Sequence, residues 1–235
     1  MRVCLASTSP ARLMLLQQFG IRPLTVAPDV DEEAVVAAVE TAEARTLAPD
    51  EHVLLLARRK AADVAARLAD DIPDFDGIVI GGDSMFELGG DVLGKPHTPE
   101  NAVARWQAMR GRTGVLHSGH AVVRLQPGVA PHEVHAVAEA SVSFVDDVTD
   151  AEITAYVATG EPLHVAGAFT LDSLGGAFIS RIDGDPSTVV GMSVSTLRRL
   201  VRELGVEWTS LWHTVDPSLE SSVAVADAPD GQPTL

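Results

Sequence analysis

Hydrophobic and polar positions in the first half of the chain form two kinds of pattern. Runs of consecutive apolar residues are typical of buried strands, and apolar positions spaced three and four apart are typical of helices that bury one face. Ser9 and Pro10 favour the start of a helix, and Gly20 favours its end. The predicted strands are Arg2–Ala6 and Gly77–Gly82, with an extended stretch over Pro23–Ala27, and the predicted helices are Pro10–Phe19, Asp31–Arg45 and Asp50–Leu68.

The second half of the chain continues the same interleaving. Thr98 and Pro99 favour the start of one helix, and a capping box of Thr149 and Glu152 starts another that ends near Thr159. Because strands and helices alternate without an internal repeat, we expect an α/β fold with a mixed sheet and flanking helices, in a single domain over residues 1–213. The other predicted elements are strands Val115–Leu125, Val134–Val145, Ala168–Leu171 and Gly176–Ile182, and an amphipathic helix Ser193–Leu204.

Composition and charge narrow the classes of function. The chain has 235 residues and a net charge of −16, which disfavours binding to nucleic acid or to an anionic membrane surface. Cys4 is the only cysteine, so an internal disulfide and a cysteine zinc site are excluded. The N-terminus lacks the continuous apolar region of a signal peptide, and no segment approaches a membrane span. We therefore expect a cytoplasmic protein.

Acidic residues are concentrated in two segments. Residues 29–51 hold eight carboxylates against the single cation of Arg45. The end of the chain, from Asp216 to Leu235, holds four carboxylates and no basic residue, and it is rich in Ser, Pro and Ala. We predict that residues 214–235 form an acidic, disordered tail without a catalytic role.

Lysine is rare in this chain. Of 17 basic residues only Lys60 and Lys95 are lysines. A compact ammonium suits a phosphate oxygen differently from a planar guanidinium, so both lysines are candidates for anion binding. Chance survival of two surface lysines accounts for the same count equally well.

A first candidate site is the segment Ser7–Arg12, which links the first strand to the first helix. The free backbone N–H groups of a helix N-terminus bind anions, and the hydroxyls of Ser7 and Ser9 add donors. Arg12 falls in the first helical turn, where the helix dipole disfavours a cation and a bound phosphate would relieve the conflict. An ordinary capped helix with a solvated arginine is the alternative.

Lys60 lies at the edge of the apolar stripe of the second long helix. A lysine in this position either extends its ammonium into solvent or meets an anion. The sequence leaves both outcomes open. The stripe consists of Val53, Ala57, Ala61, Val64 and Leu68.

Asp83 directly follows the predicted strand Gly77–Gly82, at the position where α/β sheets bind ligands. A carboxylate there can hold a divalent cation or take a proton from water. Lys95 returns a positive charge twelve residues later, and the glycines between them permit tight turns. A hairpin with solvated charges is the alternative.

Other patterns give weaker signals. The pairs His117/His120 and His132/His135 have spacings found in zinc sites, but such pairs are common on strands, so we do not expect zinc. The chain has no GxxxxGK[ST] phosphate loop, no GxGxxG at a helix start and no GxSxG elbow.

Five segments, taken in order, resemble the motifs of the Maf family of nucleoside triphosphate pyrophosphatases. They are LASTSPARLMLLQQFGI, VDEE, LARRKAADVA, GGDSMFELGGDVLGKP and AGAFTLDSLGGAFISRIDGDPSTVVGMSV, and the resemblance runs from about Val3 to Gly205. It implies an α/β fold with a central cleft, similar to that of the inosine triphosphatases, and a homodimer. It also implies Mg²⁺- or Mn²⁺-dependent hydrolysis between the α- and β-phosphates, the removal of non-standard or excess nucleotides, and a link to arrest of cell division.

The resemblance also implies roles for individual residues. Both lysines of the chain occupy motif positions, and Asp83 would be the base for the attacking water. The triphosphate would be bound by Ser7, Ser9, Arg12, Lys60 and Lys95, and the metal by Glu32 and Asp83.

Ala11, Ser84 and Asp172 correspond to positions at which subfamilies differ in base preference. The family commonly has Arg in place of Ala11, Lys in place of Val165 and often Gln in place of Asp172. Because a carboxylate only accepts hydrogen bonds, Asp172 favours an N–H-rich base edge such as that of guanine. The choice between the thymidine/uridine triphosphate type and the methylated-guanosine type stays open.

Two other functions fit parts of the sequence. A nucleotide-binding regulator of cell division without catalysis agrees with the missing cations at positions 11 and 165, although the intact Asp83 argues against it. A nucleotidyltransferase would need a glycine-rich N-terminal loop, which LASTSPAR does not provide.

Overall fold

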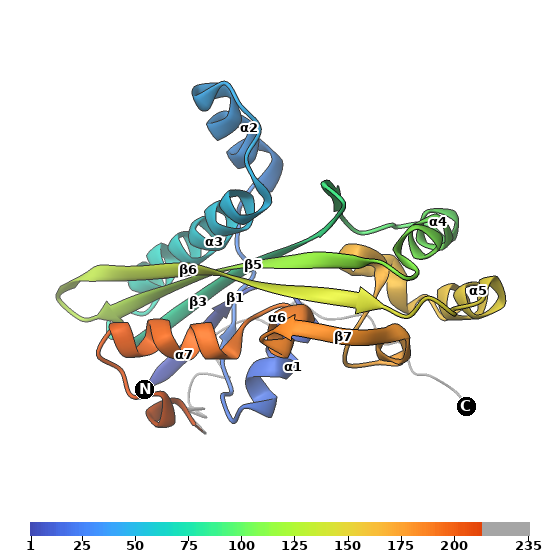
Figure 1. Cartoon of the computed structure of the whole chain (residues 1–235). Coiled ribbons are helices and arrows are strands. Elements are labelled where there is room, and N and C mark those ends of the chain that lie inside the picture. The colour runs from blue at the N-terminus through green and yellow to red at the C-terminus, as the bar shows by residue number, and fades with distance from the viewer. Residues whose placement is uncertain (213–235) are drawn as a thin grey trace.

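The fold is built on one mixed sheet, in a computed structural model that describes residues 1–212 (Figure 1). The strand order is β2-β1-β3-β5-β6-β7, with β4 paired to the far end of β3. The first strand runs parallel to both of its neighbours, and all other pairs are antiparallel. The strands are β1 Arg2–Ala6, β2 Leu24–Thr25, β3 Gly77–Leu88, β4 Asp91–Leu93, β5 Thr113–Gln126, β6 Val129–Phe144 and β7 Ile179–Gly184.

Helices cover both faces of this sheet, which confirms the predicted α/β class. Figure 1 shows α3 on one face and α1, α6 and α7 on the other, with α4 and α5 at the distal end of the long strands. The α-helices are α1 Pro10–Gln18, α2 Glu32–Glu43, α3 Pro49–Asp71, α4 Pro99–Met109, α5 Asp150–Ala158, α6 Pro186–Val190 and α7 Val194–Glu203. Short 3₁₀ segments are η1 Glu161–His164, η2 Ala166–Ala168, η3 Leu174–Phe178 and η4 Trp208–Leu211.

Apolar side chains gather in three clusters along the sheet. One joins α3 to β1, β3 and β5, and a second joins α7 to the opposite face of the same strands. The third lies at the distal end, near α4 and α5. There the Phe144 ring packs edge to face against the rings of Phe86 and of Trp106. The long strands β3, β5 and β6 therefore connect two packed regions.

Close contact between α3 and the sheet depends on two glycines. A Cβ atom at Gly81 would overlap the Ala57 carbonyl oxygen, and one at Gly119 would overlap that of Val53. Because no side chain separates the helix from the strands, Lys60 of α3 comes within hydrogen-bond distance of β3.

Two predicted strands differ from the structure. Strand β3 does not end at Gly82 but continues to Leu88, because β5 pairs with it as far as Glu87; Asp83 therefore lies inside the strand. The prediction of a strand over Ala168–Leu171 is wrong. Gly167 and Ala168 adopt φ values of 73° and 61°, in the left-handed region that interrupts a strand.

Two smaller differences lie near the end of the fold. The predicted strand Gly176–Ile182 begins as the 3₁₀ segment η3, and β7 starts only at Ile179. The sequence analysis did not predict helix α6.

The predicted acidic tail, residues 214–235, lies outside the described residues. Within residues 1–212, no helix has the length and apolar character needed to cross a bilayer.

Candidate active site

The candidate site lies at a break in the pairing of β3. Strand β1 pairs with β3 as far as Gly81, and β4 pairs with it from Phe86 onward. Within the described chain, no strand pairs with the four residues between them on that edge. Asp83 and Ser84 point to opposite faces of the sheet here, because successive side chains of a strand alternate. At this edge Asp83 contacts Lys60 of α3, and Ser84 contacts Arg12 of α1.

Lys60 meets two carboxylates at this edge. Its Nζ lies 2.7 Å from Oδ1 of Asp83 and 2.8 Å from Oε1 of Glu32. The side chains of Lys60 and Asp83 are 8% and 15% exposed, whereas that of Glu32 is 50% exposed. Of the two outcomes left open for Lys60, the second holds: the ammonium is buried and paired with anions.

Arg12 reaches the same edge from the first turn of α1. Its Nε donates to the Gly191 carbonyl at 2.9 Å, Nη2 donates to Ser84 Oγ at 3.0 Å, and Nη1 lies 3.4 Å from Ser7 Oγ. Burial lowers the pKa of the Arg12 guanidinium, and the charges of Asp83 and Glu32 oppose that shift. The guanidinium is thus held in one orientation rather than solvated.

Two serines of the β1–α1 turn contact Arg12, one at its backbone and one at its guanidinium. Ser9 caps α1 by accepting from the Arg12 backbone N–H at 3.4 Å, as predicted. Ser7 Oγ accepts from the Ser9 N–H at 3.1 Å and faces Nη1 of Arg12. A hydroxyl has two acceptor positions and one proton, and both of these contacts use Ser7 Oγ as the acceptor. Ala11 is half-buried in the same turn.

Two predicted site residues are not joined to this cluster by any contact. Lys95 lies exposed in the loop between β4 and α4 and, among the residues that the structure describes, makes no hydrogen bond or ion pair. Asp172 is exposed in the segment before η3, also without a polar partner in residues 1–212. Their roles in the site stay predictions.

The sequence analysis missed the Gly191 carbonyl, which orients three side chains. Arg12 Nε, Ser84 Oγ and Ser118 Oγ all donate to it, the two hydroxyls at 3.2 and 3.3 Å. Gly191 has a φ of 129°, a conformation that L side chains rarely adopt. A backbone carbonyl leaves no signal in the residue pattern, apart from the glycine itself.

Asp185 and His120 form hydrogen bonds with the serines on both sides of Gly191. Burial alone would raise the pKa of Asp185, but hydrogen bonds from Ser187, Ser195 and Ser193 keep it well below its usual value. His120 Nε2 accepts from the Ser193 backbone N–H at 2.8 Å. Burial, with a smaller contribution from the Arg12 charge, lowers the His120 pKa to about 4.

In residues 1–212, the histidine pairs singled out by their spacing belong to no group of three or more potential metal ligands. Both ring nitrogens of His117 face carboxylates, those of Glu87 and Glu139, at 3.1 Å. In the described chain, no group of three or more His, Cys, Asp or Glu side chains is arranged to hold a metal ion without further ligands.

The paired carboxylates of the candidate site fit a cation that also takes ligands from a substrate. Asp83 and Glu32 approach the same ammonium through Oδ1 and Oε1, so the two carboxylates lie close together and would jointly hold a divalent cation. In proteins Mg²⁺ is usually bound by one or two carboxylates. Water and phosphate oxygens complete its coordination shell.

Comparison with known proteins identifies the family. The sequence profile described as "Maf: Maf-like protein" matches residues 2–204. The chain belongs to the Maf family. The matched range contains every predicted site residue, and the resemblance inferred from the motifs is confirmed.

Two proteins similar to this chain carry the same name. A protein of Leifsonia xyli subsp. xyli, named nucleoside triphosphate pyrophosphatase, is 60% identical over 93% of this chain and 100% of its own length. A protein of the same name from Nocardia farcinica is 49% identical over 88% and 95%. Among solved structures, the Staphylococcus aureus Ham1 protein covers 62% of this chain and 73% of its own at 12% identity and a TM-score of 0.30, too weak a likeness to support an argument.

Proposed function

We propose that this Maf-family chain hydrolyses a nucleoside triphosphate between the α- and β-phosphates, releasing a nucleoside monophosphate and pyrophosphate. The observation that carries the proposal is the cluster of Lys60, Asp83, Glu32 and Arg12 at the open edge of β3. The activity named for its relatives from Leifsonia xyli and Nocardia farcinica agrees with this chemistry.

Charge balance explains why the site needs further cations. Arg12 and Lys60 are offset by Asp83 and Glu32, so the cluster itself is neutral within a molecule of net charge −16. Asp83 and Glu32 would hold a divalent cation, which would neutralise and polarise the phosphate oxygens. Lys95, exposed and without a polar partner in residues 1–212, supplies another positive charge.

The protein's own groups divide the work of binding and proton transfer. An ammonium has three donors, and Asp83 and Glu32 engage at most two of those on Lys60, so at least one remains for a phosphate oxygen. Arg12 is fixed by its contacts to Gly191 and Ser84 before substrate binds, which reduces the entropy lost on binding. Lys60 holds Oδ1 of Asp83 and so orients the carboxylate, which takes a proton from the water that attacks the α-phosphorus.

Base selection belongs to Ala11, Ser84 and Asp172 in this proposal. The Ser84 hydroxyl is engaged by Arg12, Gly191 and Ser118, so a base would contact it only by replacing one of these partners. Asp172 is exposed and unengaged within the described chain, and its carboxylate would accept from the N–H groups of a guanine-like edge. A homodimer, a cytoplasmic location and a link to cell division stay predictions.

The decisive test measures pyrophosphate release from a panel of standard and modified triphosphates with Mg²⁺ or Mn²⁺. We expect Asp83→Asn to lower kcat by about a hundredfold or more, because the amide cannot take the proton. Asp183→Asn is the matched control, since this exposed carboxylate pairs with Arg181 and, in residues 1–212, with no other cation. Equal rates for wild type and Asp83→Asn would contradict the proposal.

The same experiment separates the alternatives. Nucleotide binding without any product release would support a non-catalytic regulator, and formation of a nucleotide conjugate would support a nucleotidyltransferase. Neither product pattern is expected from a site that combines paired carboxylates with phosphate-binding cations.

A further inference from the structure

The loop that carries Lys95 is fastened on both sides of that residue. Arg105 Nη1 donates to the Gly94 carbonyl, and Asn101 Nδ2 donates to the Pro96 carbonyl at 3.1 Å. The next residue, His97, adopts a φ of 62° and donates its backbone N–H to the Leu163 carbonyl at 3.1 Å. Thus the peptide groups around Lys95 are fixed, while its side chain is exposed.

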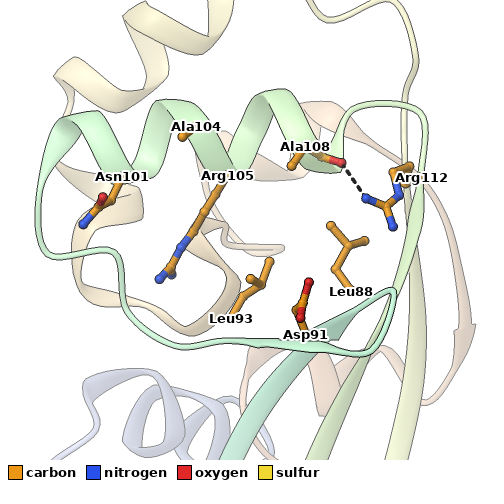
Figure 2. Close-up of a pocket in the computed structure, with 8 residues that line it drawn as sticks. All are labelled: Leu88, Asp91, Leu93, Asn101, Ala104, Arg105, Ala108 and Arg112. Carbon is orange, nitrogen blue, oxygen red and sulfur yellow. Dashed lines mark hydrogen bonds between the residues drawn. The ribbon is translucent and has the colours of Figure 1, made fainter.

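These bonds span a cavity of about 370 Å³ between α4 and the β3–β4 hairpin. Figure 2 shows Arg105 extending from α4 into this space, with Leu88, Asp91 and Leu93 of the hairpin on the other wall and Arg112 at the far end. Leu93 of β4 and Val103 of α4 pack against the distal apolar cluster, and the hydrogen bonds from Arg105 and Asn101 add polar contacts between the loop and α4.

We propose that Arg105 and Asn101 are positioning residues for Lys95. The inference rests on the proposed function, because it assumes that the Lys95 ammonium contacts the triphosphate. A lysine side chain has four rotatable bonds, and binding must also restrict its backbone unless the backbone is already fixed. By fixing the carbonyls before and after Lys95, the α4 side chains remove that additional entropy loss.

The structural part of the proposal is tested by amide hydrogen exchange in the full chain. Arg105→Ala removes the bond to Gly94, and we expect exchange at the His97 amide to rise by about tenfold as the loop opens more often. Arg105→Lys keeps a cationic donor and is expected to restore most of the protection. Arg112→Ala is the matched control: Arg112 lines the same cavity but donates to Ala108, at the end of α4. Unchanged exchange at His97 in Arg105→Ala would overturn the proposal.

The functional part is tested by a double-mutant cycle with Lys95→Ala, measured as kcat/KM for pyrophosphate release. If Arg105 acts through Lys95, Arg105→Ala lowers kcat/KM by about tenfold in the wild-type background and by less than about twofold in Lys95→Ala. A structural role would give the same factor in both backgrounds, and that result would overturn the proposal.

The proposed function and the positioning role would be refuted by different results. A wild-type protein that releases no pyrophosphate from any triphosphate would refute the proposed function, and the assignment of Arg105 and Asn101 with it. An active wild type with equal factors in the cycle, or with a normal Lys95→Ala, would refute the positioning role alone.

Discussion

Burial changes what the Lys60 ammonium contributes to the molecule. An exposed lysine pair stabilises a protein little, but a buried cation between two carboxylates prevents them from repelling each other. Asp83 is only 15% exposed, so it depends on this partner. The same contact that prepares the candidate site therefore also stabilises the fold.

We expect Lys60→Met to lower the free energy of unfolding by about 3 kcal/mol, because Asp83 is left buried without its cation. Urea denaturation measures the change. Lys95→Met is the matched control and is expected to change stability by less than about 0.5 kcal/mol, since Lys95 is exposed. Adding Asp83→Asn to Lys60→Met should recover part of the loss; a further drop would contradict the explanation.

His120 makes stability depend on pH. Its pKa is lowered from 6.5 to about 4, so the unfolded chain binds a proton more readily than the folded one between those values. Stability is therefore full above pH 6.5 and falls as the pH drops toward 4, by up to about 3 kcal/mol.

The measurement is urea denaturation between pH 4 and 7 for the wild type and His120→Gln. Glutamine places an amide oxygen near the position of Nε2, where it can accept from Ser193 without titrating. The variant is expected to lose this part of the pH dependence. An identical pH slope in both proteins would show that other groups cause it.

At the scale of elements, the position of α3 on the sheet determines where Lys60 lies. Gly119→Ala would force a methyl group against the Val53 carbonyl and push the helix away from β5. We expect a loss of about 2 kcal/mol in stability and a lower kcat, because Lys60 and Asp83 separate. Denaturation and steady-state rates test both effects. Gly94→Ala, with open space around the added atom, is the control for stability.

The elements that were predicted correctly carry their signal in neighbouring residues. The side chains of Ser9 and Thr149 cap the N-termini of helices α1 and α5, as the sequence indicated. The extension of β3 through Asp83 depends on pairing with β5, some thirty residues away, and could not be derived from local pattern. Left-handed conformation at Ala168 is likewise imposed by its surroundings, because alanine does not favour it.

The candidate site likewise has parts that local sequence predicts and parts that depend on the fold. The motifs pointed to Arg12, Lys60 and Asp83, and they also included Ser7, Ser84 and Glu32, which contact these residues in the structure. Ser118 and the Gly191 carbonyl gave no signal that distinguishes them from other polar groups, and only the fold brings them to Arg12.

At the scale of the whole molecule, a net charge of −16 opposes the approach of a polyphosphate. Added salt screens this long-range repulsion more than the short contacts inside the site. We expect kcat/KM at saturating Mg²⁺ to rise about twofold between 20 and 150 mM salt. Steady-state kinetics at several salt concentrations check this. A steep fall would instead mean that attraction by local cations governs the encounter.

Helix α2 buries none of its residues, and Figure 1 shows it projecting past α3, yet it begins with Glu32. Any cation bridging Glu32 and Asp83 would anchor that arm to the sheet. Thermodynamic linkage is reciprocal, so a contact that immobilises α2 would also raise the affinity for the cation. Changes at its remote tip, near Glu43, should then tune metal affinity from a distance.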